Sequence, residues 1–321
     1  MKDLSDCFSP SGREQNIREM IINEISDYAD EINIDALGNV IARKKGKGKK
    51  ILFSAHMDQI GLIITHVDER GFLRFSNVGG IDADELTGLH MVFDNGLEGF
   101  ISSEELEEKE KLTMSKLFLD VASTSKDFVK NNFKVGDMCV FQAQYYETPD
   151  CVMCKAADNR IGCYVLIEAL KNHPATDNDV YYVFSVQEEV GCRGAKTAAY
   201  SINPDLGIAV DVTSTGDSED GTKMDVKLGD GAAIKIMDKS VIAHPEVKEL
   251  LTNLAIENSI KYQYEVLEFG GTDAGPIHLS REGVPSGAIS IPTRNIHSSG
   301  EIFNKQDVIE CIRLIQATAA K

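Results

Sequence analysis

The sequence predicts an α/β protein: a three-layer domain into which a small β-barrel-like domain is inserted. Short apolar segments alternate with amphipathic helical segments along most of the chain, a pattern typical of an open, largely parallel sheet covered on both faces. This alternation stops near residue 69 and resumes near residue 151. Between these points, glycine turns separate short strand-like segments, which indicates a compact β domain. We therefore expect 1–68 and 151–321 to form the α/β domain and 69–150 to form the insertion.

The expected helices carry apolar residues at intervals of three or four. In 13–28, the residues Ile17, Ile21 and Ile25 fall on one helical face. Further helices are expected at 160–172, 245–258 and 305–318. Strands are expected at 39–45, 49–56, 180–186, 205–212 and 286–291. The 180–186 segment has no alternating polar residues, so both of its faces should be buried.

The composition indicates a globular protein and argues against nucleic-acid and membrane partners. Hydrophobic residues make up 42% of the 321 residues, and the formal net charge is −18. The basic cluster at 43–50 precedes an apolar strand, and we interpret it as a solvated turn rather than a nucleic-acid site. No apolar run reaches the roughly 18–20 residues that cross a bilayer, and residues 1–15 lack the apolar core of a signal peptide. We therefore expect a cytoplasmic protein.

The seven cysteines are scattered, which indicates reduced thiols in a chain without a secretory signal. Cys151 and Cys154 form a C-x-x-C pair, a spacing that also occurs in metal and redox sites. A zinc ribbon needs a second such pair, which the sequence lacks. Buried free thiols are therefore the favoured interpretation.

Acidic and imidazole side chains recur where the expected strands end. Glu188 and Glu189 stand side by side just after the apolar 180–186 strand, and a buried charge is costly unless it is paired or binds a metal. Comparable junctions carry His56, Asp58, Asp158, Asp211 and His297. One such residue alone would usually be a helix cap or a surface charge. Five junctions in one domain predict a site, because ligands bind at the carboxyl ends of strands in open α/β sheets, and these nitrogen and oxygen ligands suit zinc, cobalt or manganese.

Six motifs, taken in their order along the chain, resemble those of the tetrahedral aminopeptidase family. They are AHMDQIG (55–61), DNRIG (158–162), VQEEVGCRGA (186–195), AVDVT (209–213), GGTDAGPIH (270–278) and PTRNIHS (292–298). This family of dinuclear-zinc exopeptidases includes glutamyl and deblocking aminopeptidases and is sometimes labelled cellulase or endoglucanase M. The resemblance covers nearly the whole chain. It implies a zinc-exopeptidase-like fold and the removal of N-terminal residues from short peptides.

The resemblance implies two divalent metal ions per subunit, with zinc as the first choice and cobalt or manganese as alternatives. Asp158 would bridge the two ions. His56 and Asp211 would complete one site, and Glu189 and His297 would complete the other. Two ions so placed lower the pKa of a water held between them and stabilise a developing oxyanion.

Further roles follow from the same resemblance. Glu188 would be the general base that takes a proton from the metal-bridged water, and Asp58 would orient His56. Asp273 and Arg294 are candidates for substrate binding, and a turn aspartate that binds backbone amides is an equal alternative for Asp273. Asn295 departs from the aromatic residue expected after the arginine, which leaves the pocket shape and the preferred N-terminal residue open.

Two other functions are weighed against an aminopeptidase. A glycan hydrolase of the endoglucanase type needs a suitably spaced carboxylate pair and an aromatic platform, yet aromatic residues make up 7% of the chain and tryptophan is absent. A non-catalytic, metal-stabilised assembly protein would lack a base, yet Glu188 is present. An aminopeptidase is therefore favoured. Because metal ions offset the acidic ligands, we expect a neutral or basic first residue to be tolerated.

The resemblance also implies homo-oligomers, in which dimers form through 69–150 and six dimers close into a hollow dodecamer. A small β insertion covers little of the α/β domain, so its own apolar face should need a partner. Candidates for that face are Leu86, Leu89, Val92, Phe93, Leu117 and Phe118. Some of these residues should instead fill the core of the insertion.

Overall fold

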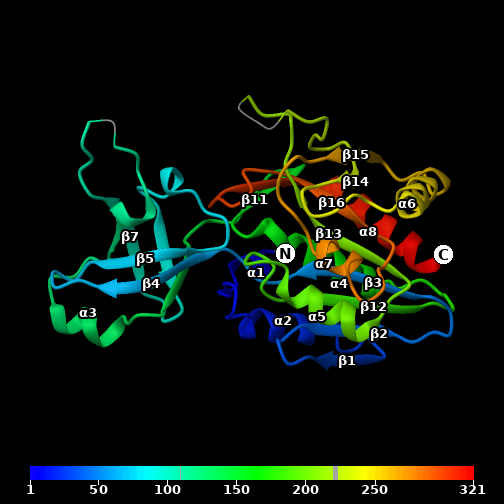
Figure 1. Ribbon diagram of the computed structural model, residues 1–321, viewed down its shortest axis with the longest axis horizontal. Coiled ribbons are helices and arrows are strands. Elements are labelled where there is room, and N and C mark those ends of the chain that lie inside the picture. The colour runs from blue at the N-terminus through cyan, green and yellow to red at the C-terminus, as the bar shows by residue number, and fades with distance from the viewer. Residues whose placement is uncertain (109, 220–222) are drawn as a thin grey trace.

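The computed structural model describes residues 1–108, 110–219 and 223–321. Within these residues, the chain forms a mixed sheet of 11 strands with helices on both faces, and a separate closed barrel (Figure 1). The predicted α/β fold with an inserted β barrel is confirmed.

Four parallel strands form the centre of the sheet. In spatial order they are β12 (Asp179–Ser185), β3 (Lys50–His56), β13 (Leu206–Thr213) and β16 (Ser286–Arg294). One edge adds β2 (Val40–Lys44) and β1 (Glu31–Ile34), both antiparallel to their neighbours. At the other edge, β16 pairs antiparallel with both β14 (Ala232–Met237) and β17 (Glu301–Asn304). Beyond these lie β15 (Tyr262–Val266), β11 (Cys151–Cys154) and β10 (Tyr146–Glu147). The predicted parallel character therefore belongs to the four central strands.

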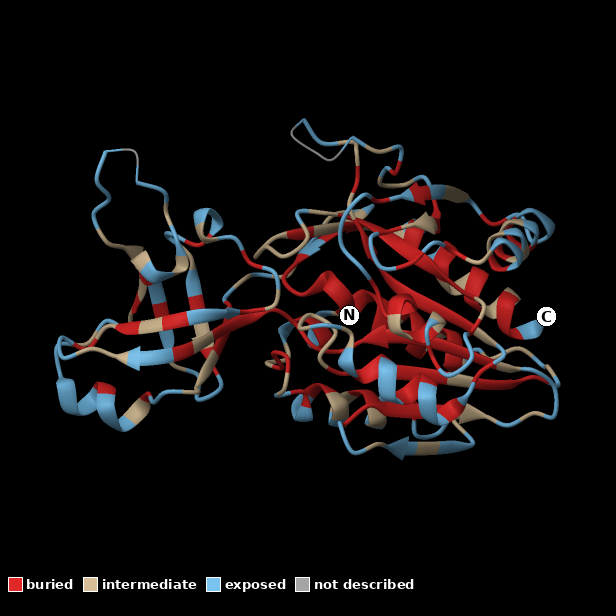
Figure 2. Cartoon of the chain, in the orientation of Figure 1, coloured by how far each residue is buried: buried red, intermediate tan, exposed pale blue. Residues whose placement is uncertain are grey.

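Helices cover both faces of this sheet. One face carries α2 (Gln15–Ile25), α4 (Ala157–Lys171), α6 (Pro245–Glu257) and α8 (Lys305–Ala320), with α1 (Lys2–Asp6) against α4. The other face carries α5 (Arg193–Ile202) and α7 (Ala274–His278). Figure 2 shows that the central strands and the helix surfaces against them are buried. Burial of both faces explains why the central strands are apolar throughout.

The helices expected at 13–28, 160–172, 245–258 and 305–318 correspond to α2, α4, α6 and α8. Helix α5 was not predicted, because its buried face consists of small residues such as Ala195, Ala198 and Ala199 rather than large aliphatic ones. None of the described helices is both long and apolar enough to cross a membrane.

The closed barrel begins shortly after β3 in the chain. Its strands, in sequence order, are β4 (Gly61–Val67), β5 (Leu73–Val78), β6 (His90–Phe93), β7 (Glu98–Ser103), β8 (Leu117–Asp120) and β9 (Met138–Phe141). The connections contain α3 (Lys126–Asn132) and the short 3-10 turns η1 (Ala83–Glu85) and η2 (Met114–Lys116). The barrel strands thus begin before the expected limit at 69 and end before 150. No change of composition marks the start, because β4 is as apolar as β3 and follows it closely. The division of the chain into three domains stays a prediction.

The six apolar candidates for a partner face divide between the inside and the outside of the barrel. Leu86, Phe93 and Leu117 are buried in the barrel core, and Leu89 packs against that core. Val92 and Phe118 are partly exposed. These two residues are therefore the ones left for contact with another surface.

Candidate active site

The candidate metal ligands lie where the central strands end or where a helix begins. β3 ends at His56, and Asp211 is near the end of β13. Glu189 follows β12, and His297 follows β16. Asp158 stands in the first turn of α4, where its backbone departs from helical angles. Because the carboxyl ends of parallel strands meet at one edge of a sheet, these side chains converge.

The five side chains form two groups of three that share one residue. In the first group, His56 Nε2 lies 3.0 Å from Asp158 Oδ1 and 3.6 Å from Asp211 Oδ1. In the second group, His297 Nε2 lies 3.2 Å from Asp158 Oδ2 and 3.2 Å from Glu189 Oε2. Within each group, one candidate ligand atom of every residue lies within 4.8 Å of the others. Asp158 therefore turns a different carboxylate oxygen toward each group.

Burial has a strong effect on the charges of these groups. It raises the pKa of Asp211 to about 7 and also raises the pKa of Glu189, because a charged carboxylate loses its hydration. Burial acts in the same direction on Asp158, but hydrogen bonds with His297 and His56 hold its pKa below the usual value. Among the described residues, no group donates a hydrogen bond to the buried Oε1 of Glu189. Imidazoles, clustered carboxylates and a free buried oxygen form a donor set that fits divalent metal ions.

Asp58 connects His56 to the loop that carries the two glutamates. Its Oδ1 accepts a hydrogen bond from the backbone N–H of Glu188 at 3.0 Å, and its Oδ2 accepts one from the N–H of Glu189 at 3.3 Å. Ser11 Oγ donates to Oδ2 at 2.6 Å. The distance from His56 Nδ1 to Asp58 Oδ1 is 3.5 Å, which is longer than a usual hydrogen bond. In this structure, Asp58 holds the loop more directly than it holds the imidazole.

Glu188 lies beside the first group of ligands and belongs to neither group. Its Oε2 is 3.8 Å from His56 Nε2, and its side chain is 12% exposed toward the cavity. Its Oε1 accepts a hydrogen bond from Cys192 Sγ at 2.9 Å. Burial raises the pKa of this carboxyl group well above its usual value. The side chain is thus placed to exchange a proton with a molecule in the cavity.

Comparisons with known proteins agree with this geometry. The family model described as M42 glutamyl aminopeptidase matches residues 38–314. The chain belongs to the M42 glutamyl aminopeptidase family. A putative aminopeptidase of Acetivibrio thermocellus is 49% identical over 316 residues, which cover 98% of this chain and 96% of the relative.

Solved structures of aminopeptidases superpose over the full length of this M42 chain. Aminopeptidase APDkam598 from the archaeon Desulfurococcus kamchatkensis matches with a TM-score of 0.95 and 38% identity, covering 99% of this chain and 93% of that one. The TET1 peptidase of Pyrococcus horikoshii, which can assemble into a tetrahedron or a large octahedral shell, matches with a TM-score of 0.88 and 34% identity. That match covers 100% of this chain and 98% of the other. A Thermotoga maritima structure titled endoglucanase matches with a TM-score of 0.84 and 31% identity, covering 99% of this chain and 96% of that one.

The predicted resemblance to aminopeptidases is therefore confirmed, and this M42 chain is a hydrolase that acts on peptide bonds. Divalent metal ions are the cofactors that the family and the two ligand groups indicate.

The two tentative substrate-binding residues make their hydrogen bonds to other side chains of this M42 chain. Asp273 is buried, and its Oδ2 accepts hydrogen bonds from Ser54 Oγ and Ser185 Oγ, both at 2.6 Å. Arg294 forms a bidentate ion pair with Asp217, at 3.0 Å from Nε to Oδ1 and 2.6 Å from Nη2 to Oδ2. Neither is among the described residues that line the cavity.

Sequence reasoning missed Glu301, which supports both ligand groups. Its buried carboxylate accepts the backbone N–H of Asp158 through Oε2 and the N–H of His297 through Oε1, both at 2.8 Å. The sequence signal that could have identified it is an acidic residue, Glu301, next to the apolar residues Ile302 and Phe303 and just after the PTRNIHS motif.

Asn295, which stands where an aromatic residue was expected, adopts a φ of +57° in the turn after β16. Asparagine tolerates this left-handed conformation better than most residues.

The cavity at the ligands has a volume of about 470 Å³. Glu188 and the five candidate ligands open into it, and Lys235 reaches it from β14. Lys235 is neutralised there by a close contact with Glu265 and by Asp238 at 3.3 Å. The apolar side of the cavity is formed by Val212, Leu267, Phe269 and Ile296.

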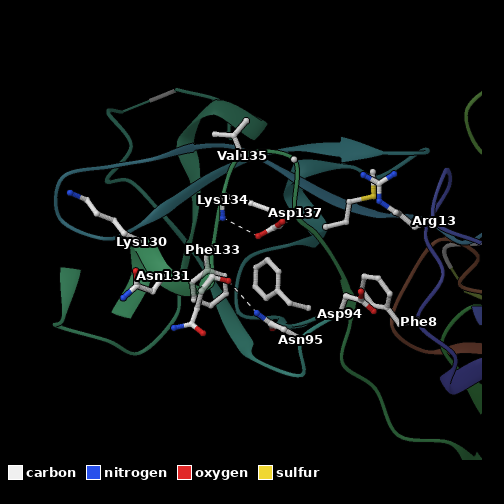
Figure 3. Close-up of a pocket in the computed structure, with 14 residues that line it drawn as sticks. Phe8, Arg13, Asp94, Asn95, Lys130, Asn131, Phe133, Lys134, Val135 and Asp137 are labelled. Atoms are coloured by element: carbon white, nitrogen blue, oxygen red, sulfur yellow. Dashed lines mark hydrogen bonds between the residues drawn. The ribbon is translucent and has the colours of Figure 1, made fainter. Parts of the chain in front are cut away.

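A second cavity, of about 540 Å³, lies between the N-terminal segment and the barrel (Figure 3). Phe8 and Arg13 line it from one side, and barrel residues such as Asp94, Asn95 and Lys134 line it from the other. None of the candidate metal ligands or Glu188 lines this cavity. Although it is larger, it lacks the chemistry of the first cavity, so we place the active site in the smaller one.

Proposed function

We propose that this protein removes the N-terminal residue from short peptides at a centre of two divalent metal ions, with Glu188 as the general base. The observation that carries the proposal is the placement of Asp158. Its two oxygens face two separate groups of ligands. Glu188 lies 3.8 Å from His56 of the first group and lines the same cavity as all five candidate ligands. A carboxylate that could hold two ions, with a second carboxylate outside both ligand groups, suits hydrolysis assisted by two metal ions.

The metal ions would be held by this chain's own nitrogen and oxygen atoms. His56 and Asp211 would complete one site with Asp158, and Glu189 and His297 would complete the other. This ligand set suits zinc first, with cobalt and manganese as alternatives. When bound, the two ions would supply Lewis-acid chemistry, which acidifies water and stabilises negative charge on the carbonyl oxygen of the substrate.

Glu188 would carry the proton. A carboxylate that ligates no metal can accept a proton from the attacking water at its Oε atoms and deliver that proton to the leaving amine. Asp58 supports this role, because its hydrogen bonds to the N–H groups of Glu188 and Glu189 fix the loop that aims both side chains. The two adjacent glutamates would thus have different tasks, one as base and one as ligand.

The residues that line the cavity would determine which N-terminal residues of a peptide are accepted. Leu267 and Phe269 offer an apolar surface next to the ligands. The cation of Lys235 is already paired with Glu265 and Asp238, so it has little charge to offer an acidic substrate. We therefore propose that neutral or basic first residues are accepted in preference to acidic ones.

A pair of assays tests the proposed activity against glycan hydrolysis. We expect release of p-nitroaniline from aminoacyl-p-nitroanilides, loss of this activity with a chelator, and its recovery when zinc, cobalt or manganese is returned. A glucan incubated with the same protein serves as the control and should yield no reducing sugar. Sugar release without nitroaniline release would overturn the proposal in favour of a glycan hydrolase. A strict preference for acidic residues across the nitroanilide panel would contradict the proposed pocket.

A further inference from the structure

A third group of possible metal ligands lies beside the two groups described above. Glu188, Cys192 and Asp273 each place one ligand atom within 4.8 Å of the other two. Asp273 and Cys192 belong to neither of the two proposed metal sites, and Glu188 is the proposed base. The proposed reaction assigns no role to the sulfur of Cys192.

A tight turn brings the thiol of Cys192 to the carboxylate of Glu188. The backbone carbonyl of Glu188 accepts hydrogen bonds from the N–H groups of Gly191 and Cys192, both at 2.8 Å. Cys192, with a φ of +50°, then serves as the residue that precedes α5. This turn places Sγ 2.9 Å from Glu188 Oε1, and both side chains line the active-site cavity.

Asp273 provides independent evidence that a ligand binds between Glu188, Cys192 and Asp273. The residue is only 2% exposed. Its Oδ2 is satisfied by two serine hydroxyls, from Ser54 and Ser185. Its Oδ1 is buried and receives no hydrogen bond from any residue that the structure describes. A buried carboxylate oxygen without a partner is costly, and a cation would remove that cost.

We propose that Glu188, Cys192 and Asp273 form a third, inhibitory cation site that takes a thiophilic divalent ion such as Cd²⁺ or excess Zn²⁺. One thiolate sulfur and two carboxylate oxygens are suitable ligands for such ions, and three protein ligands leave a fourth position for water. On binding, the proton of the Cys192 thiol leaves to solvent and an S–metal bond forms, with no change in oxidation state.

The consequence for catalysis rests on the proposed role of Glu188. A carboxylate that ligates the third ion can no longer accept a proton from water. Occupancy of this site would therefore stop the reaction while the ions at the two catalytic sites stay in place. The site would make the enzyme sensitive to thiophilic metals through a residue that takes no part in the reaction itself.

Cadmium titration of the metal-loaded enzyme tests the site with a readout that does not depend on activity. We expect one further equivalent of Cd²⁺ per chain, retention of the original metal ions by elemental analysis, and the ultraviolet absorption of a cadmium–thiolate bond. The nitroanilide rate should fall in parallel. In Cys192→Ser, the absorption should vanish. The half-inhibitory Cd²⁺ concentration should rise roughly tenfold or more, because even residues that only support ligands cost about 10–100-fold in metal affinity.

Two further variants make the test specific. Asp273→Asn keeps the shape of the side chain but loses its charge, and it should also raise the half-inhibitory concentration. Cys151→Ser removes another partly exposed thiol, on β11 and away from the cavity, and should behave like the unmodified protein. Each inhibition curve is compared with the uninhibited rate of the same variant, and circular dichroism checks that each variant is folded.

The outcomes separate this inference from the proposed function. The third site is overturned if Cys192→Ser keeps the cadmium–thiolate absorption, or if it is inhibited at the same Cd²⁺ concentration as the unmodified protein. It is equally overturned if inhibition coincides with loss of the original metal ions. Absence of peptidase activity before any cadmium is added would instead refute the proposed function, and the absorption and elemental analysis would still test the site.

Discussion

Glu188 and Glu189 show how adjacent residues with the same side chain can differ in task. Glu189 contributes Oε2 to the ligand group around His297, whereas Glu188 stays outside both groups and reaches the cavity. On a chain that leaves a strand, neighbouring side chains point in different directions. The pair of glutamates therefore offers a matched comparison between a base and a ligand.

We expect Glu188→Gln to keep its bound metal and its substrate affinity but to lose turnover. Removal of a positioned general base typically costs about 10²–10⁴-fold in kcat. Glu189→Gln is the matched control, and it should lose metal instead. The measurements are kcat, KM and metal content for both variants. Full kcat in Glu188→Gln would place the base elsewhere.

The ion pair between Asp217 and Arg294 gives a prediction about stability and pH. Hydrogen bonds from Arg294 lower the pKa of Asp217 to about 2, from 3.8 in the unfolded chain. The stabilisation is therefore complete above about pH 4 and is lost as the pH falls toward 2, because the unfolded state then binds the proton first. We expect Asp217→Asn to lower the free energy of unfolding by about 1 kcal/mol at pH 7, since Arg294 is partly exposed and solvent screens the pair.

Urea unfolding at several pH values measures this effect. The difference between Asp217→Asn and the unmodified protein should stay constant from pH 7 to about pH 4 and shrink as the pH falls further toward 2. A difference that stayed constant down to pH 2 would show that the carboxylate charge contributes nothing to stability.

At the scale of elements, Glu301 holds the start of α4 and the turn after β16 in one arrangement. It accepts the N–H groups of Asp158 and His297, which belong to these two elements. Each of these residues is a candidate metal ligand, so the Glu301 carboxylate joins the backbones of two candidate ligands while it belongs to neither ligand group. Partners of this kind fix the orientation of metal ligands.

We expect Glu301→Gln to weaken metal binding by about 10–100-fold. The amide has one acceptor oxygen for two N–H donors, and its NH₂ group would face one of those donors. Competition with a chelator measures the affinity. Glu98→Gln, an exposed glutamate on β7, is the control. Release of metal from both variants at the same chelator concentration would remove Glu301 from this role.

At the scale of the whole molecule, the barrel stands apart from the α/β domain and contacts little of it (Figure 1). Its core is filled by its own residues, such as Leu86 and Leu117, while Val92 and Phe118 stay partly exposed. A separate module with exposed apolar residues favours a partner, and two-fold pairing is the commonest symmetric solution. We propose dimers formed through the barrel, with six dimers in a hollow dodecamer.

Light scattering in solution tests this assembly. Twelve chains of 35.2 kDa would weigh about 422 kDa. A dimer would support the barrel interface alone, and a monomer with bound metal at micromolar concentration would rule out both. If the dodecamer forms, short peptides should be cleaved and folded proteins with a free N-terminus should resist.

The sequence by itself determined the fold class, the family and the residues from which a site could be built. Apolar strands that end in His56, Asp211 or the Glu188–Glu189 pair are local features of the sequence. Because burial of a charged or polar side chain is costly unless it is paired or binds a metal, such residues indicate a site even without a structure. The same local logic failed for α5, whose alanines give a weak helical signal, and for the start of the barrel, where two apolar strands follow one another.

Only the tertiary structure decided how the site residues are arranged. The sharing of Asp158 between two groups depends on the order of β3, β13 and β16 in the sheet. Glu301 lies 143 residues from Asp158 in the chain, yet the two are in direct hydrogen-bond contact. Arg294 forms an ion pair with Asp217, which lies 77 residues away in the chain. Contacts between residues so far apart depend on which strands pair and which faces the helices cover, and no local pattern of side chains encodes that choice.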